Sequence, residues 1–477
     1  MKTVLANDTG FLVRCFLLVG PSPQRPSLPS GNRPQDIRLQ ERIDRMIASL
    51  PFLTSYDPPG TSEGALDPLG LYQIADQLAV QLVPAVRERM QRVRFLTAMA
   101  VGALVTEGLE DDPRNRDASP YLVWEWLLVE AVTRKLRNDD GIWGVPGTLV
   151  AGRALDRHGY LDARSYLKTP RIFGFHGVYK RLATYLGVVD VHLAAGPKAE
   201  DLADAWARGL GYAGLSDAKP LIARWSRAVQ RSLSESPPRT NPGWSGGSWD
   251  ELALAFVPSE CKAKEKRCLR GLLLTAGDRQ LGALPTIWQI QADIADGDFS
   301  EERLHDRIEE LVPGYQPLLD AIRSYEAFAR CLQDGFDLLR AEAGRPDAQG
   351  FSVSDIAQDR EFQQSVKGLH KRFEATYRAL GELTGTTSSL QSLFSDRFRL
   401  FADPMDEVEC ALALCSHHEV IQKAKSALGK RPWFDRLGRD RIYIRHDYRI
   451  SRPEIKPGRY VHDYRGWPIR RFWRDLV

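Results

Sequence analysis

The sequence has few cysteines and no long hydrophobic run. Six cysteines are scattered over 477 residues, which is not the dense pattern of a disulfide-bonded secreted protein. The chain contains no run of 18 apolar residues, so we expect no membrane-spanning segment and no membrane partner. These absences predict a cytoplasmic protein.

Familiar catalytic and metal-binding motifs are also scarce. There is no Walker A motif and no His-Glu-x-x-His motif. Cys261 and Cys268 have no second pair at zinc-finger spacing, and Cys410 and Cys415 lie beside histidines that would not converge on one ion from a single helix. We therefore expect no metal, no cofactor and no identifiable catalytic residue, and the enzyme question stays open with a preference for no activity.

The last 48 residues, 430–477, are strongly basic. They contain fourteen Lys/Arg and six Asp/Glu, a net charge of +8, whereas the whole chain carries +3. Nine aromatic residues alternate with these charges, and cations beside rings suit phosphates and bases. The predicted nucleic-acid-binding residues of this segment are Arg445, Arg449, Arg465, Arg470 and Arg471. The alternative is a structural cap, in which the rings pack inward and the arginines face water.

Alternating patterns predict two short strands in this segment, at 441–445 and 459–462, paired as a small antiparallel β-hairpin. The tetrapeptide His-Asp-Tyr-Arg occurs twice, at 446–449 and 462–465. We interpret the repeat as hairpin symmetry. In the alternative, His446, Asp447, His462 and Asp463 form the site of a metal-dependent nuclease.

A second basic concentration lies at 150–185, within a winged-helix-like segment at 150–195. A helix predicted at 160–167, a glycine-containing turn and a second helix at 178–186 follow one another as in a helix-turn-helix or winged-helix reader, with 188–193 as a wing strand. Its predicted nucleic-acid-binding residues are Lys168, Arg171, Tyr179, Lys180, Arg181 and Thr184. The competing interpretation is helix-turn-helix geometry used only for packing.

The remaining patterns predict a mainly α, multi-domain protein. Apolar residues at helical spacing predict helices at 71–100 (bent at Pro84), 121–136, 318–339, 362–380 and 408–428. We expect a leader and Pro-rich arm at 1–40, a helical domain at 41–235, a linker at 236–250, a second helical domain at 251–429 and the basic segment at 430–477.

Four stretches of the chain are similar to uncharacterised bacterial proteins encoded in antiphage defence islands. They are Asp67–Gly70 leading to Arg94–Thr97, Tyr166–Tyr179, Tyr325–Arg330 and Asp463–Arg465. The resemblance implies a subunit of a multi-protein system that acts on nucleic acid. Our first expectation is therefore a non-enzymatic subunit that binds nucleic acid, DNA rather than RNA, together with other protein subunits. The alternatives are a metal-dependent nuclease subunit and a structural scaffold that contacts acidic partner proteins.

Overall fold

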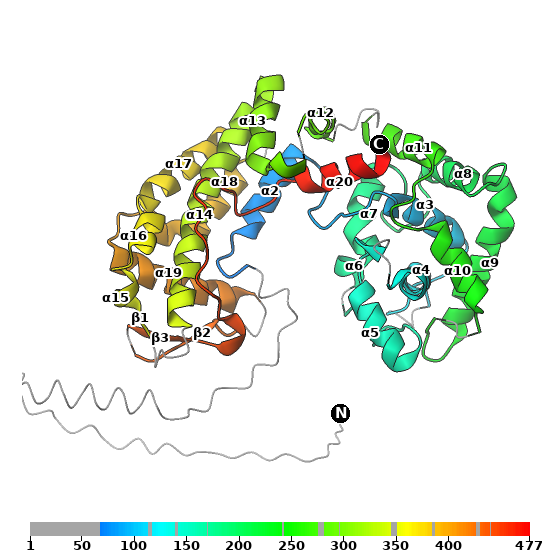
Figure 1. Ribbon diagram of the computed structural model, residues 1–477, viewed down its shortest axis with the longest axis horizontal. Helices are drawn as coiled ribbons and strands as arrows, with labels where there is room; N and C mark the ends of the chain where they lie inside the picture. Colours follow the sequence, from blue (N-terminus) through cyan, green and yellow to red (C-terminus); the bar gives the residue numbers. More distant parts are fainter. Residues whose placement is uncertain are drawn as a thin grey trace, which may run out of the picture. The chain divides into compact units, whose positions relative to one another are not determined.

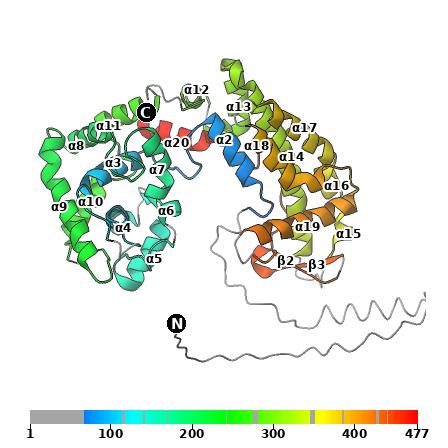
Figure 2. The same ribbon diagram turned by 180° about the vertical axis from the view of Figure 1, so that it is seen from behind.

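A computed structural model describes residues 67–112, 117–138, 142–168, 170–240, 243–274, 281–294, 296–344, 351–383, 387–425, 430–438 and 440–477. The predicted leader and Pro-rich arm lie outside the described residues. The described part of the chain is mainly helical, as the sequence predicts, with one three-stranded sheet (Figures 1 and 2). None of its helices is long and apolar enough to cross a membrane.

The predicted helix at 71–100 is two helices. α2 (Tyr72–Leu82) ends just before Pro84, residues 83–94 are not helical, and α3 (Phe95–Val105) follows. Proline removes a helical hydrogen bond and clashes with the preceding turn, and Ala85 then takes a left-handed φ of 66°. The bend that the sequence predicts is therefore a full interruption.

α4 (Pro120–Leu136) is buried on nearly all sides, as predicted. Ser119 caps its first turn, and Pro120 supplies a preset φ at the first helical position. α3, α5 (Thr148–His158), α9 (Leu215–Ser234) and α10 (Gly246–Ala255) contact it. An apolar helix in this position needs neighbours all around, and these four helices provide them.

The middle of the chain also contains α6 (Pro170–Phe173), α7 (Phe175–Tyr185), α8 (Ala199–Gly209) and α11 (Ala263–Leu274). The helix predicted at 160–167 is wrong, because α5 ends at His158, Gly159 caps it, and turns follow. The predicted wing at 188–193 has only an isolated bridge between Val189 and Ala195. Helical structure is thus present, but a winged helix is not confirmed.

Aromatic side chains join the residues on both sides of the predicted linker. Trp206 and Phe256 stack with centroids 5.3 Å apart, and the ring centroids of Trp124 and Phe256 lie 5.9 Å apart. Thr240, within the predicted linker, donates a 2.5 Å hydrogen bond to buried Glu130 of α4. Thr240 is therefore fixed to α4.

Later helices gather around α14 (Gln316–Ala343), which confirms the predicted stripe at 318–339. They are α13 (Glu301–Leu311), α15 (Val353–Ile356), α16 (Arg360–Val366), α17 (Leu369–Glu382), α18 (Thr387–Phe398) and α19 (Glu407–Ala424). α12 (Leu284–Ile290) contacts α11 and α13 instead. The stripe at 362–380 is divided between α16 and α17 by Gly368, which has a φ of 71°. The predicted helix at 408–428 corresponds to α19, which ends at Ala424, and residues 426–428 lie outside the described residues.

The sheet has the strand order β1-β3-β2 and is antiparallel throughout. Its strands are β1 (Phe351–Ser352), β2 (Phe434–Arg436) and β3 (Arg441–Ile444). β2 and β3 form a small hairpin, with Phe434 opposite Ile444. The predicted strand 441–445 is therefore present, but the predicted partner at 459–462 is not a strand. α20 (Gly466–Leu476) follows and contacts α11, α12 and α13.

Candidate nucleic-acid interface

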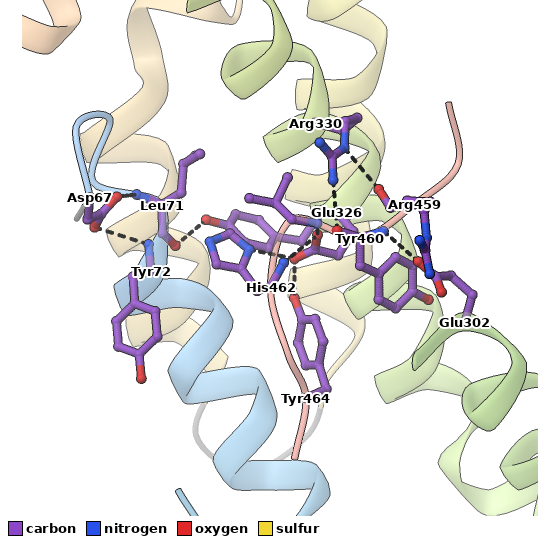
Figure 3. Close-up of polar contacts among 12 residues, drawn as sticks. Asp67, Leu71, Tyr72, Glu302, Glu326, Arg330, Arg459, Tyr460, His462 and Tyr464 are labelled. Atoms are coloured by element: carbon purple, nitrogen blue, oxygen red, sulfur yellow. Dashed lines mark hydrogen bonds and ion pairs between the residues drawn. The ribbon is translucent and has the colours of Figure 1, made fainter. Parts of the chain in front are cut away.

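Residues 459–465 lie along α14 and are held by its side chains (Figure 3). Glu326, only 1% exposed, accepts hydrogen bonds from the backbone N–H of Val461 and from Nδ1 of His462 at 2.7 Å. The hydroxyl of Tyr464 donates to the same carboxylate at 2.7 Å. One buried carboxylate thus satisfies donors that would otherwise need a neighbouring strand.

Two further side chains hold the same segment. Glu302 accepts a 2.6 Å hydrogen bond from the backbone N–H of Tyr460. Arg330 donates to the backbone oxygens of Arg459 at 2.9 Å and Tyr460 at 2.7 Å (Figure 3). The alternating residues at 459–462 are therefore extended without being a strand, because side chains replace the ladder partner. This corrects the predicted strand pair.

Two arginines predicted to bind nucleic acid are buried. Arg465 and Arg470 are each 1% exposed. Arg465 forms an ion pair with Asp76, and Arg470 donates to Gln291 Oε1 at 3.0 Å and to the Ile294 oxygen at 2.8 Å. A cation with these partners cannot reach a phosphate in this structure. These two positions depart from the expectation that the tail arginines face outward.

The other predicted tail arginines are half-buried and lie on rings. Arg445 lies 5.7 Å from the centre of the Tyr448 ring, Arg449 lies 5.0 Å from that of Tyr443, and Arg471 lies 5.8 Å from that of Trp143. Arg449 also hydrogen-bonds the Tyr443 hydroxyl. Cations stacked on rings in this way stabilise packing, whereas the structural-cap alternative expects the arginines to face water.

The two His-Asp-Tyr-Arg copies have unlike environments. His446 and Asp447, in a short 3₁₀ turn, have side chains 89% and 82% exposed, whereas the His462 side chain is 11% exposed. The predicted hairpin symmetry is wrong, since only the first copy follows a strand. No group of three His, Cys, Asp or Glu side chains in the described ranges could hold a metal ion.

The basic region at 150–195 has a mixed surface. Tyr179 is fully buried, and its hydroxyl accepts hydrogen bonds from the backbone N–H groups of Gln91 and Arg92, both at 2.9 Å. Burial raises the pKa of Tyr179, so its phenol stays neutral. Thr184 donates to the Asp190 oxygen at 3.3 Å. Tyr179 therefore fixes α7 in place and offers nothing to a ligand.

Several cations of the same region do reach the surface. Lys168 and Arg181 are exposed and Lys180 is half-buried. Further exposed cations are Arg153, Arg157 and Arg164. The ion pairs of the described residues include none of these six side chains. The side chain of Arg171 lies outside the described residues.

A groove that the sequence did not reveal lies between α9 and the start of α10. It has a volume of about 360 Å³. Arg224, Arg227 and Arg231 line it from α9, and Trp244 and Ser245 line it from the other side, with Ser248 and Glu251 of α10. Arg224 pairs with Glu251 at 2.9 Å, while Arg227 and Arg231 have no carboxylate partner among the described residues.

The helical pattern of α9 explains this surface. Its apolar positions, including Leu221, Trp225 and Val229, are buried, and the arginines occupy the opposite face three and four residues apart. The loop 243–245 then starts α10, whose first-turn amides carry partial positive charge. The signal in the sequence was the Arg-x-x-Arg-x-x-x-Arg spacing beside a Trp-Ser-Gly-Gly-Ser-Trp loop, which we interpreted only as a linker.

Two motif spacings that we did not identify in the sequence lack the structural setting that their motifs require. Gly243–Gly247 has the Gly-x-Ser-x-Gly spacing of a nucleophile elbow, but Ser245 has an ordinary extended conformation, with φ −72° and ψ 162°, and the described residues before it, up to 240, include no strand that leads into it. Gly209–Gly214 has the Gly-x-Gly-x-x-Gly spacing, but it connects α8 to α9. There Asp204 already accepts the Leu215 amide at 2.8 Å, so a pyrophosphate would meet a carboxylate.

A larger cavity of about 660 Å³ lies between α13, α14, α16, α17 and residues 455–460. Most of its charges are satisfied internally, as in the pairs of Arg323 with Asp306 at 2.9 Å and of Arg330 with Asp334 at 3.1 Å. Burial raises the pKa of the Cys331 thiol in its wall to about 11, so the thiol is protonated at neutral pH. This cavity lacks an activated nucleophile among its described side chains.

Comparison of the chain with protein-family models, with curated proteins and with solved structures gives no match.

Proposed function

We propose that this protein is a non-enzymatic, nucleic-acid-binding subunit of a larger assembly and that the α9–α10 groove is its main contact. The observation that carries this proposal is the face of α9, where Arg227 and Arg231 are exposed and have no carboxylate partner in the described part of the chain, beside a hollow of about 360 Å³. Trp244 adds a ring on which a base can stack. Exposed cations that release counterions from phosphates, next to an aromatic surface, are what single-stranded nucleic acid requires.

The exposed cations of 150–195 give a second contact region. The backbone N–H of Arg239 donates to the backbone oxygen of Ser232 in α9, and Arg239 forms an isolated antiparallel β-bridge with Asp162. The Arg239 guanidinium lies 4.9 Å from the centre of the Tyr160 ring. These contacts bring the segment around Arg164 next to the C-terminal end of α9. A nucleic-acid strand that leaves the groove at this end of α9 would meet the positive charge of these exposed cations. DNA is the first ligand to test, and the defence-island resemblance of the sequence supplies the setting of a multi-protein system.

The proposal is tested by the salt dependence of binding. A labelled single-stranded DNA is titrated with the purified chain at several salt concentrations, and fluorescence anisotropy gives the slope of log K against log salt. Arg227→Gln with Arg231→Gln should reduce the magnitude of that slope by about 1 per lost phosphate contact and weaken binding.

Arg267→Gln with Arg270→Gln is the matched control, because both are exposed arginines on one helix, α11, away from the groove. An equal loss in the control pair would show that only net charge matters and would contradict the groove. If the unmodified chain does not bind DNA, the proposal is wrong and the structural-scaffold alternative remains.

A further inference from the structure

The α9–α10 groove has a carboxylate at one end of its row of arginines. Arg224, Arg227 and Arg231 follow one another on the exposed face of α9. Glu251 of α10 forms an ion pair with Arg224 Nη2 at 2.9 Å, so this carboxylate lies at the Arg224 end. Arg231 lies two helical turns later, roughly 10 Å along the helix axis. The groove is therefore most positive at the Arg231 end and presents an acidic group at the other end.

Glu251 does not serve to hold a phosphate, because two negative charges repel each other. Its Oε1 accepts the hydrogen bond from Arg224, and Glu251 has no second hydrogen-bond partner in the part of the chain that the structure describes. An ionised carboxylate can accept about four hydrogen bonds, so this half-buried group keeps acceptor capacity in the wall of the groove. The side chain is thus placed to receive N–H groups of a bound ligand, and Arg224 fixes its position.

The four DNA bases differ in the N–H groups that they can donate to a carboxylate. The Watson–Crick edge of guanine presents N1–H and N2–H₂ side by side, which match the two oxygens of one carboxylate. Cytosine and adenine present one amino group beside a ring nitrogen that is itself an acceptor, and the single N–H of thymine lies between two carbonyl oxygens. A side chain that only accepts hydrogen bonds therefore favours guanine over the other three bases.

We propose that the α9–α10 groove recognises a guanine in single-stranded nucleic acid and that Glu251 determines this preference, which rests on the nucleic-acid binding proposed above. Guanine N1–H and N2–H₂ donate to Glu251, and the base stacks on Trp244. Arg227 and Arg231 hold the adjoining phosphate.

The size and the walls of the groove suit one base. Its volume of about 360 Å³ equals roughly twelve waters at ~30 Å³ each, which is room for one base rather than several. Trp249 supports the ring of Trp244, with the two ring centres 4.7 Å apart. The stacking surface and the acceptor therefore belong to the same small hollow.

The test compares two labelled strands by fluorescence anisotropy with the full chain. One is a short oligothymidylate, and the other is the same strand with a single guanine at its centre. We expect the unmodified protein to bind the guanine strand about tenfold more tightly. Hypoxanthine in place of the guanine keeps N1–H and removes only the N2 amino group, so it should lose most of this preference without any change to the protein.

Glu251→Gln should bring the affinities for the two strands to within about twofold of each other, since the amide replaces one acceptor oxygen with a donor. Its affinity for oligothymidylate should not fall, because a negative charge is removed from the groove, whereas a folding defect would weaken binding of both strands. Asp250→Asn is the matched control, because Asp250 is the preceding residue of α10 and pairs with Lys135 at 3.0 Å outside the groove lining. It should keep the preference for guanine.

The possible outcomes separate the guanine preference from the proposed function. Equal affinity of the unmodified protein for both strands would overturn the preference and leave the proposed nucleic-acid binding intact. An unchanged preference in Glu251→Gln, or with hypoxanthine, would also overturn it, since guanine would then be recognised by other groups. If neither strand binds, the proposed function is wrong and the preference is wrong with it.

Discussion

Residues 430–477 and helix α9 are both basic, but they use their arginines in opposite ways. The tail segment carries a net charge of +8, yet Arg465 and Arg470 are buried against Asp76 and Gln291. α9 carries only four Lys/Arg and one Asp, and its Arg227 and Arg231 are exposed. Charge density along a sequence therefore does not measure the charge that a surface presents. Position relative to an apolar helical face is the better guide.

The largest expected effect is a loss of stability when a buried arginine of the tail segment is replaced. Arg470→Gln removes a buried guanidinium that bonds Gln291 and the Ile294 oxygen and lies 4.6 Å from the Phe299 ring centre. The free energy of unfolding, from urea denaturation, should fall by about 3 kcal/mol, while DNA affinity of the folded protein stays the same. Arg474→Gln, at an exposed position of the same helix, is the control. Weaker DNA binding at unchanged stability would mean that Arg470 contacts the nucleic acid and does not serve packing.

A second effect concerns the docking of the tail at low pH. His418 donates from Nδ1 to the Pro68 oxygen at 2.9 Å and accepts the Trp433 amide at Nε2, also at 2.9 Å. Burial lowers its pKa to about 3, below the value of about 6.5 in the unfolded chain. Its contribution to stability is therefore full above pH 6.5 and is lost progressively as the pH falls towards 3.

Between pH 7 and pH 5 this single group should cost the unmodified protein about 2 kcal/mol of unfolding free energy. His418→Gln should remove that part of the pH dependence in urea denaturation. His446→Gln, at a side chain 89% exposed, should not. An unchanged slope in the His418 variant would contradict the neutral, doubly bonded imidazole.

A third, smaller effect concerns the contribution of Trp244 to DNA binding in the α9–α10 groove. Trp244 lies in the groove, half-buried, with its ring centre 4.7 Å from that of Trp249. Trp244→Leu should weaken single-stranded DNA binding by about 1–2 kcal/mol through lost stacking, and duplex DNA should be affected less. Anisotropy with both DNAs measures the difference. Trp143→Leu, at a half-exposed tryptophan outside the groove, should behave like the unmodified protein.

The smallest expected effect is the change in the salt dependence of DNA binding when the cations of α7 are replaced. Lys180→Glu with Arg181→Glu should lower the salt slope by about 2 at most and leave folding intact, because neither side chain is in an ion pair of the described residues. The thermal midpoint and the slope are measured together. If both stay unchanged, the segment 150–195 has no contact with DNA and the groove acts alone.

Local patterns predicted the helices well where one face dominates. The stripe at 318–339 is α14, and the apolar run at 121–136 is α4. The strand expected at 459–462 failed for a physical reason. Its alternation is real, but its backbone donors bond the carboxylates of Glu302 and Glu326, which lie more than a hundred residues earlier. Nothing local distinguishes that arrangement from a strand.

The candidate site shows the same limit. Arg465 and Arg471 look alike in sequence, yet one pairs with Asp76 and the other lies over Trp143. Whether an arginine is buried depends on a distant carboxylate or carbonyl that the sequence does not identify. Conversely, the arginines of α9 stand at helical spacing opposite apolar residues, so their exposure could have been predicted. They were passed over because the tail has the higher charge.

The distant partners of α20 also bear on synthesis. Asp475 receives Arg92 and the Val93 amide from positions 383 and 382 residues earlier, and Arg465 reaches Asp76. During translation, residues 83–94 emerge from the ribosome more than 380 residues before the groups of α20 that they contact. Contacts of such sequence separation slow folding, so the half-made protein exposes Arg92 and Asp76 unpaired. We therefore expect chaperone dependence during translation, because contacts between groups so far apart in the sequence close this part of the fold.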